Sequence, residues 1–403
     1  MKHMTKYFII ILLAFPLFLK AQQTEEMQYR RSSIYSLLIN HTNQKFSKEI
    51  ADVFKKMPVP DKYNDHDLSV KVVSTDRKIK EDELGREFLE TNNVASRLVA
   101  RWFNRNILTG ECNTALIKER GLYNASELDK ELAERSARGK AMLEDAGEEL
   151  IGNTFVLVND IRYVDKEKTS KGFGAFMRIA GSLASAYTGQ DLYNDIGNLA
   201  GTMTETLKGF RVKIDTHLYQ LVWDEATAMD FYTNYYSDSE KDSLKRNAFE
   251  KNRNKFHLKY IGNQQNNSNI TSFMGVNLDV PEQMIRKACQ RALDENVVLL
   301  QRKFEAFKIK TPLISTTPLK AAIGLKEGIT PESVFEVLEA VMDENEHITY
   351  KRAGIIKPVP NLIWDNRYMA SEEGAYGADF QYTTFKKVRG KDFYPGMLIR
   401  EIK

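Results

Sequence analysis

Residues 154–164 read TFVLVNDIRYV, and residues 210–223 read FRVKIDTHLYQLVW. Both stretches are rich in the β-branched and aromatic residues that favour strands. In the second stretch, the apolar Val212 and Ile214 alternate with the charged Lys213. A period of two gives a strand one buried face and one face toward water. The sequence therefore predicts two long strands, with the residues between them forming an insertion.

The insertion at residues 172–208 combines helical spacing of its apolar residues with frequent glycines. Small residues recur four apart, a spacing that lets two helix backbones approach closely. We expect a glycine-rich helical hairpin that lies tightly on the sheet, because glycine inside a helix costs about 1 kcal/mol and needs a packing reason. The alternatives are a membrane-contacting insertion, a mobile loop and an interface with a partner protein. The candidate interaction surface comprises Phe173, Phe176, Met177, Leu183 and Tyr187.

The chain before these strands mixes helices with at least one strand. Apolar residues follow a helical period over residues 43–57 and 91–103, and residues 68–73 form a short β-favourable run. Ser126 begins a pattern that is typical of a helix start. We therefore expect an N-terminal α/β region over residues 22–150.

Residues 151–310 are expected to form a sheet-and-helix region around the insertion. Residues 256–261 favour a strand, and the polar, asparagine-rich residues 263–269 that follow are predicted to be a loop. The strongest helical pattern in the chain begins at Pro281 and ends near Lys310. A domain boundary is placed directly after this helix.

Residues 312–403 are expected to be all-β. Short β-favourable runs alternate there with glycines and turn residues. The runs are residues 334–341, 348–352, 355–359 and 380–388. Several short strands in this length suggest a small closed or half-closed barrel. The expected fold class is thus α+β: a mixed α/β body with a glycine-rich helical hairpin insertion, plus a small C-terminal all-β barrel-like domain.

Residues 1–21 have the layout of a secretory signal peptide. Lys2 and Lys6 precede a charge-free apolar run over residues 7–19, and the small Ala21 provides a cut site. The run is too short to span a bilayer, which takes roughly 20 helical residues. We expect export to the periplasm, to the outer membrane or to the medium; an uncleaved N-terminal anchor is the alternative.

The composition is that of a folded protein, with 42% hydrophobic and 28% charged residues. Removal of residues 1–21 would take the formal charge from +3 to about 0, so no electrostatic feature points to nucleic acid. An oxidising compartment would permit a disulfide between Cys112 and Cys289, but their spacing does not show that they meet. A buried, inert thiol is the commoner outcome for Cys289.

The common catalytic motifs are missing from the sequence. It has no nucleophile elbow, zinc-protease helix, paired C-x-x-C or phosphate-binding loop, so no catalytic residue and no cofactor is assigned. Asp65, His66 and Asp67 could bind a divalent metal or position a base, and are the weak candidates for a metal site. Because adjacent residues rarely converge on one ion, the main interpretation is a solvated turn before a strand at Leu68.

Four stretches of the chain support a resemblance to known proteins. They are YRRSS at 29–33, PVPDKYNDHD at 58–67, WFNR at 102–105 and NLIWDNR at 361–367. Together they resemble an uncharacterised family of exported Bacteroidetes-type proteins. That resemblance implies export and supplies no mechanism.

A second resemblance concerns architecture. The sequence IGLKEG at 323–328, followed by FEVL at 335–338, resembles the small barrels of envelope assembly proteins of the flagellar accessory type. The strand pair at 154–164 and 210–223 is similar to the core of proteins of the curli-secretion type. These resemblances imply a role in envelope assembly.

These features favour a non-enzymatic exported cell-envelope protein with a structural, assembly or interaction role. Its partners would be other envelope proteins or a membrane surface, and its oligomeric state is left open. The alternatives are an exported hydrolase, whose site assembles from distant residues, and a module that binds a sugar, lipid or peptide.

Overall fold

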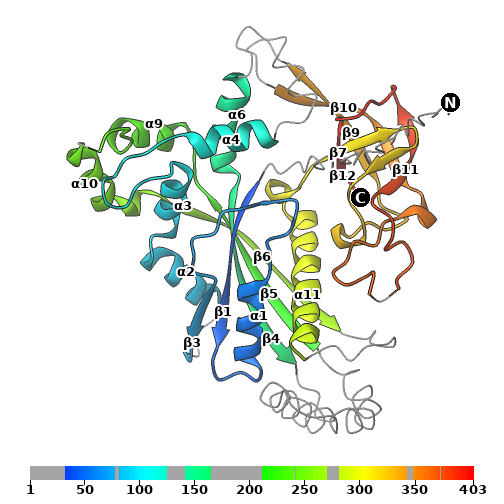
Figure 1. Cartoon of the computed structure of the whole chain (residues 1–403), viewed down its shortest axis with the longest axis horizontal. Helices are drawn as coiled ribbons and strands as arrows, with labels where there is room; N and C mark the ends of the chain where they lie inside the picture. Colours follow the sequence, from blue (N-terminus) through cyan, green and yellow to red (C-terminus); the bar gives the residue numbers. More distant parts are fainter. Residues whose placement is uncertain are drawn as a thin grey trace, which may run out of the picture.

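The computed structural model describes residues 32–77, 81–124, 141–164, 211–240, 242–269, 281–342, 348–372 and 374–403. The protein combines helices and strands in two units, a layered body and a ring of strands beside it (Figure 1). The predicted signal peptide, the hairpin at 172–208 with its candidate interaction surface, and the helix start at Ser126 lie outside the described residues. The α+β class is confirmed.

The body is built on a six-stranded sheet with the order β2-β1-β4-β5-β6, in which β3 also pairs with β1. Its strands are β1 (Ser33–His41), β2 (Asn64–Asp65), β3 (Val72–Thr75), β4 (Thr154–Val164), β5 (Arg211–Leu221) and β6 (Leu258–Asn269). β1 runs parallel to β2, β3 and β4, whereas β5 is antiparallel to both of its neighbours. Val164 at the end of β4 pairs with Arg211 at the start of β5.

The two strands expected from the alternating stretches are present. β4 spans the whole of 154–164, and β5 lies within 210–223. The prediction of a loop at 263–269 is wrong, because these polar residues form the second half of the edge strand β6. Pairing with β5 satisfies their backbone groups, and the side-chain amides of Asn263 and Gln265 donate to the Asp215 carboxylate on β5.

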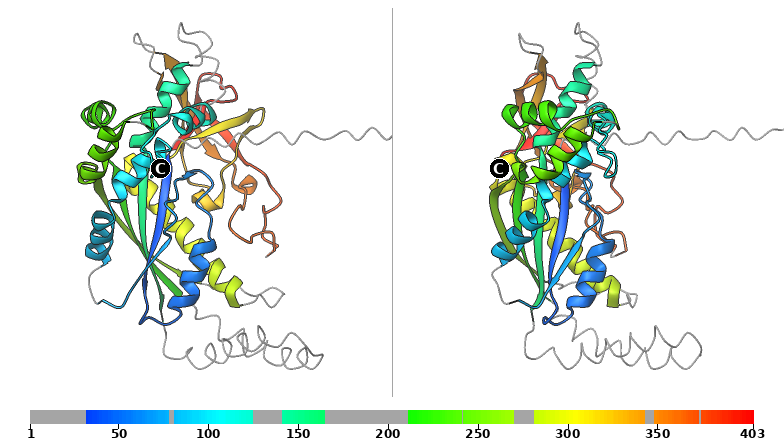
Figure 2. Two further views of the ribbon diagram at one scale, coloured as in Figure 1. Left: turned by 60° about the vertical axis from the view of Figure 1, so that its left-hand side comes forward. Right: turned by 90° about the vertical axis from the view of Figure 1, so that its left-hand side faces the viewer.

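Helices cover both faces of this sheet (Figures 1 and 2). One face carries α1 (Ser47–Lys56) and the long α11 (Pro281–Lys303), in the two stretches with helical patterns. The prediction that the long helix ends near Lys310 is wrong, because α11 ends at Lys303 and the short 3-10 helix at Glu305–Phe307 follows it. The other face carries α2 (Glu81–Thr91), α3 (Val94–Trp102), α4 (Ala115–Asn124), α6 (Ala141–Gly152), α9 (Glu225–Asn234) and α10 (Ser243–Lys251). The central strands are therefore apolar on both faces: on β4, Phe155 and Leu157 enter one core, and Val156 and Val158 enter the other.

The ring consists of six strands that close in the order β10-β11-β8-β7-β12-β9. They are β7 (Thr311–Thr316), β8 (Leu319–Ala321), β9 (Phe335–Met342), β10 (Ile348–Pro358), β11 (Thr383–Gly390) and β12 (Leu398–Glu401). The two runs expected at 348–352 and 355–359 are one strand, β10, with a bulge between Arg352 and Gly354. Gly354 faces Gly390 across the β10–β11 pair.

A compact junction joins body and ring. The short 3-10 helix η2 (Glu305–Phe307) follows α11, and its buried Phe307 ring stacks on Tyr63, with centroids 5.1 Å apart. Among the described residues, three ion pairs cross from body to ring: Lys326 Nζ lies 2.7 Å from Asp61 Oδ2, Arg302 Nη2 lies 2.9 Å from Glu401 Oε1, and Arg400 Nη1 lies 2.8 Å from Glu305 Oε1. Body and ring therefore share a polar interface.

Asp294 is a buried carboxyl group of α11 at this junction. The side chain of Gln290 donates to its Oδ1 at 3.1 Å. Burial raises the pKa of Asp294 to about 6; the positive charge of Lys326 opposes this rise, and the carboxylates of Glu327 and Asp61 add to it. At neutral pH Asp294 is ionised, and burial of its carboxylate reduces the stability of the fold.

We expect this carboxyl group to give the protein a measurable pH profile. Its native pKa lies above the unfolded value of about 3.9, so the native state binds more protons between about pH 4 and pH 6. The free energy of unfolding should therefore fall as the pH rises through that window. D294N should flatten the fall and raise the free energy of unfolding at pH 7 by about 3 kcal/mol. Urea unfolding at several pH values measures both effects, and D52N, at an exposed site on α1, should keep the wild-type profile. An unchanged slope in D294N would contradict this assignment.

Among the described residues, none of the helices is both long enough and apolar enough to cross a membrane.

Candidate functional site

His66, which the sequence placed in a solvated turn, is fully buried, so that prediction is wrong. Its ring lies 5.1 Å from the Trp102 ring between centroids. Arg120 Nη1 donates to Nδ1 at 2.9 Å, and Nε2 lies 3.1 Å from the Leu98 carbonyl oxygen. These contacts fit a neutral imidazole that carries its proton on Nε2. Burial, with the charge of Arg120, holds the pKa of His66 well below its usual value.

The two acids beside His66 do not converge with it. Asp65 is exposed at the end of β2, and Asp67 is half-buried, where it accepts a hydrogen bond from the Ser69 amide at 2.9 Å. In the part of the chain that the structure describes, no group of three His, Cys, Asp or Glu side chains is placed to hold a metal ion. The geometry therefore does not support the weak metal candidates Asp65, His66 and Asp67.

The two cysteines are free and buried in different cores. Cys112 packs on the face covered by α3, and Cys289 packs on the opposite face within α11. Burial raises the pKa of the Cys112 thiol and raises the pKa of the Cys289 thiol to about 12. Neither group is a thiolate at neutral pH, so neither is a ready nucleophile.

A thiol-reactive dye should test this arrangement directly. We expect the native protein to react slowly, because both thiols are buried and protonated. In denaturant the same sample should give two thiols per chain, Cys112 and Cys289. Two fast-reacting native thiols, or none after unfolding without reductant, would contradict the structure.

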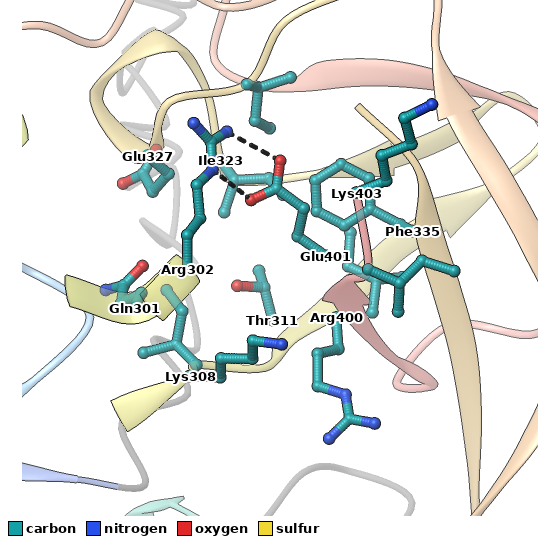
Figure 3. Close-up of a pocket in the computed structure, with 14 residues that line it drawn as sticks. Gln301, Arg302, Lys308, Thr311, Ile323, Glu327, Phe335, Arg400, Glu401 and Lys403 are labelled. Carbon is teal, nitrogen blue, oxygen red and sulfur yellow. Dashed lines mark hydrogen bonds and ion pairs between the residues drawn. The ribbon is translucent and has the colours of Figure 1, made fainter. Parts of the chain in front are cut away.

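A cavity of about 250 Å³ lies between body and ring and is lined by both polar and apolar side chains (Figure 3). Its body side consists of Gln301 and Arg302 at the end of α11, followed by Lys308 and Ile309. Its ring side includes four buried apolar residues of the ring core, Ile323, Ile329, Phe335 and Ile399. We call this cavity the apolar pocket.

Charged side chains border the apolar pocket, and ion pairs hold them in place. Arg302 donates from Nε and Nη2 to the two carboxylate oxygens of Glu401, at 3.1 and 2.9 Å (Figure 3). Ser333 Oγ donates to the same carboxylate at 2.9 Å. Arg302 also donates to the Gly328 carbonyl oxygen at 2.7 Å. This bidentate arrangement fixes the end of α11 against β12.

A second cavity of about 190 Å³ shares Lys308, Ile309 and Arg400 with the apolar pocket. Ser32 and Asn153, which directly precede β1 and β4, also line it, so it lies at the amino ends of these parallel strands. We call it the basic pocket. The two pockets are adjacent because they share these three lining residues, and we call the pair the groove between body and ring.

The basic pocket has more positive than negative side chains. Its cations are Lys62, Lys308, Lys310 and Arg400, and its carboxylate is Glu305. Glu305 accepts from Arg400 Nη1 at 2.8 Å and lies 2.7 Å from Lys308 Nζ. The Lys308 contact and the charges of Lys308, Arg400 and Lys310 lower the pKa of Glu305. The pocket thus has a potential that favours anions.

A different polar cluster lies at the carboxyl ends of β1 and β4, the opposite end of the sheet. His41 Nε2 is 3.5 Å from Asp160 Oδ2, and Asp160 pairs in register with Asp215. Arg162 donates from Nε to both oxygens of Asp160, at 3.0 and 2.9 Å. Burial, and then the Asp215 carboxylate, raise the pKa of Asp160, while the positive charge of Lys213 opposes this rise. Burial and the charge of Arg162 lower the pKa of His41.

In comparisons with known proteins, no family model matches the chain, and no protein of described function matches it at a significant level.

The sequence patterns did not locate the groove. Its residues come from near 32, 62 and 153 and from three separate stretches after 300, so no short motif contains them. The sequence did contain one indication, two small groups of basic residues. Lys308 and Lys310 lie at the expected end of the long helix, and Arg400 and Lys403 lie within the last four residues. Only the packing of ring on body brings these cations together.

Proposed function

We propose that this chain is a non-enzymatic, exported cell-envelope protein with an assembly or interaction role. On this proposal it is a member of the exported Bacteroidetes-type family that it resembles, and its ring acts as a small barrel docked on the body. It would be held in the periplasm, at the outer membrane or in the medium after loss of residues 1–21. Its binding site is the groove between body and ring.

The observation that carries this proposal is that charged side chains in the groove form ion pairs with one another. Arg302 is paired with Glu401, and Lys308 and Arg400 are paired with Glu305. Such paired groups favour recognition through charge and shape, whereas an acid–base catalyst needs a group that exchanges protons near neutral pH. A groove with an apolar floor and few converging polar groups is typical of binding sites.

Site-specific photo-crosslinking in cells tests the proposal. A photoreactive residue at Gln301, which lines the groove, should give an adduct in the envelope fraction on a chain that has lost residues 1–21. The same residue at Leu244, which is 82% exposed on α10, is the matched control and should give far less adduct. A full-length cytosolic chain, or equal adducts at both positions, would reject the proposal.

The polar cluster around Asp160 favours a second candidate, an exported hydrolase. A carboxyl group and an imidazole 3.5 Å apart, His41 and Asp160, can exchange a proton with a substrate. Hydrolysis of a chromogenic ester, glycoside or peptide that is lost in both H41Q and D160N would support this candidate. Lack of turnover across the three substrate classes would exclude it.

A further inference from the structure

The basic pocket contains two independent features that select a negatively charged group. Four cationic side chains line it against the single carboxylate of Glu305. Glu305 is itself 65% exposed, so a bound anion could take its place beside Lys308 and Arg400 without opening the core. Arg400 keeps a second partner, because its Nε donates to Glu336 at 2.7 Å. Arg400 would therefore stay in position when its other partner changes.

The neighbouring apolar pocket would select a ligand that also carries an apolar group. Ile323, Ile329, Phe335 and Ile399 are buried members of the ring core that also line this cavity. Burial of an apolar group there would be favourable, because it removes apolar surface from water. Lys308, Ile309 and Arg400 line both pockets, so charged and apolar binding surfaces lie next to each other.

We propose that the groove binds an anionic amphiphile, with its carboxylate or phosphate head among Lys62, Lys308, Lys310 and Arg400 and its apolar part on the ring residues. This inference rests on the proposed binding function and names its ligand class. The head would form charge-assisted hydrogen bonds with lysine and arginine side chains. An acyl chain would be excluded from water by the apolar pocket.

Calorimetric titration of the exported chain with matched probes tests this ligand class. Dodecyl phosphate and dodecanoate, below their micelle concentrations, should bind at least tenfold tighter than dodecyltrimethylammonium or dodecyl maltoside. Inorganic phosphate, which lacks the chain, should also bind at least tenfold more weakly than dodecyl phosphate. Affinity for the anionic probes should fall as salt rises.

Two substitutions with opposite expected effects make the test sharper. E305Q removes the resident carboxylate and should tighten binding of dodecyl phosphate severalfold, a gain that misfolding cannot produce. K310Q should weaken it about tenfold. K55Q, at an exposed lysine of α1, should change neither affinity nor fold. Circular dichroism and urea unfolding check that each variant is folded.

Sedimentation with phosphatidylglycerol vesicles separates the sources of the ligand. If the protein binds the vesicles, the ligand is a bilayer lipid. If it binds the dodecyl probes but not the vesicles, the ligand is a free fatty acid or an alkyl phosphate. Equal affinity for anionic, neutral and cationic probes, or no change in E305Q and K310Q, would overturn the inference. If the Gln301 adduct still forms in that case, the proposed binding function stands and only the ligand class is wrong.

Discussion

Trp102→Ala should lower the free energy of unfolding by about 4 kcal/mol, the largest loss expected from a single substitution. Trp102 is fully buried at the end of α3, and its Nε1 donates to Thr154 Oγ1 on β4 at 2.8 Å. The Arg120 guanidinium lies over its ring, 4.5 Å from the centroid. Alanine would leave a cavity, an unsatisfied buried hydroxyl and a buried cation without its aromatic partner.

Urea unfolding followed by circular dichroism measures this loss. W102F should lose less, because phenylalanine fills most of the space but cannot donate to Thr154. I107A is the matched surface control, since Ile107 is 85% exposed, and it should change the free energy of unfolding by less than about 0.5 kcal/mol. A loss in W102A below about 1 kcal/mol would mean that α3 does not pack on the sheet as described.

Gly390→Ala should lower the free energy of unfolding by about 3 kcal/mol, through backbone strain and overpacking. Gly390 has a φ of +127°, which side chains with a Cβ rarely adopt. A Cβ there would lie 2.5 Å from the Ala353 carbonyl oxygen and 2.5 Å from the Gly354 Cα. Both are backbone atoms of β10, so β10 and β11 would have to move apart.

Gly374 provides the matched control for this substitution. It also has a positive φ, +62°, but a Cβ there would meet nothing within 4 Å. G374A should therefore cost only the strain of the left-handed conformation, about 1 kcal/mol. Equal losses in G390A and G374A, measured by thermal unfolding, would show that β10 and β11 are not closely paired at Gly354 and Gly390.

The sequence was sufficient for strands and helices whose periodicity is strong. β4, β5 and α11 were predictable because one or both faces are apolar over more than nine residues. β1 was not predicted, because the polar residues Ser33, Ser36 and Asn40 interrupt its apolar residues although the strand is buried. The second half of β6, residues 263–269, was mistaken for a loop because its strand form is decided by pairing with β5 and not by its asparagine-rich composition.

The side-chain sites were less predictable than the fold, for a related reason. The acids on either side of His66 suggested solvent, but Arg120 and Trp102 reach its ring from distant positions and bury it. The groove likewise depends on how ring and body dock, which no local pattern encodes. Spacing along the chain predicts local conformation, whereas these sites arise from contacts between segments far apart in sequence.

The pairing of Val164 with Arg211 means that the segment between β4 and β5 can be replaced without changing the sheet. The chain leaves the sheet and returns to it at adjacent points, so the scaffold is already closed without residues 165–210. The entropic cost of joining two such points grows only slowly with linker length. The connection between β4 and β5 is therefore a suitable insertion site. A two-residue turn or a reporter protein could replace residues 165–210 while β4 and β5 keep their pairing register.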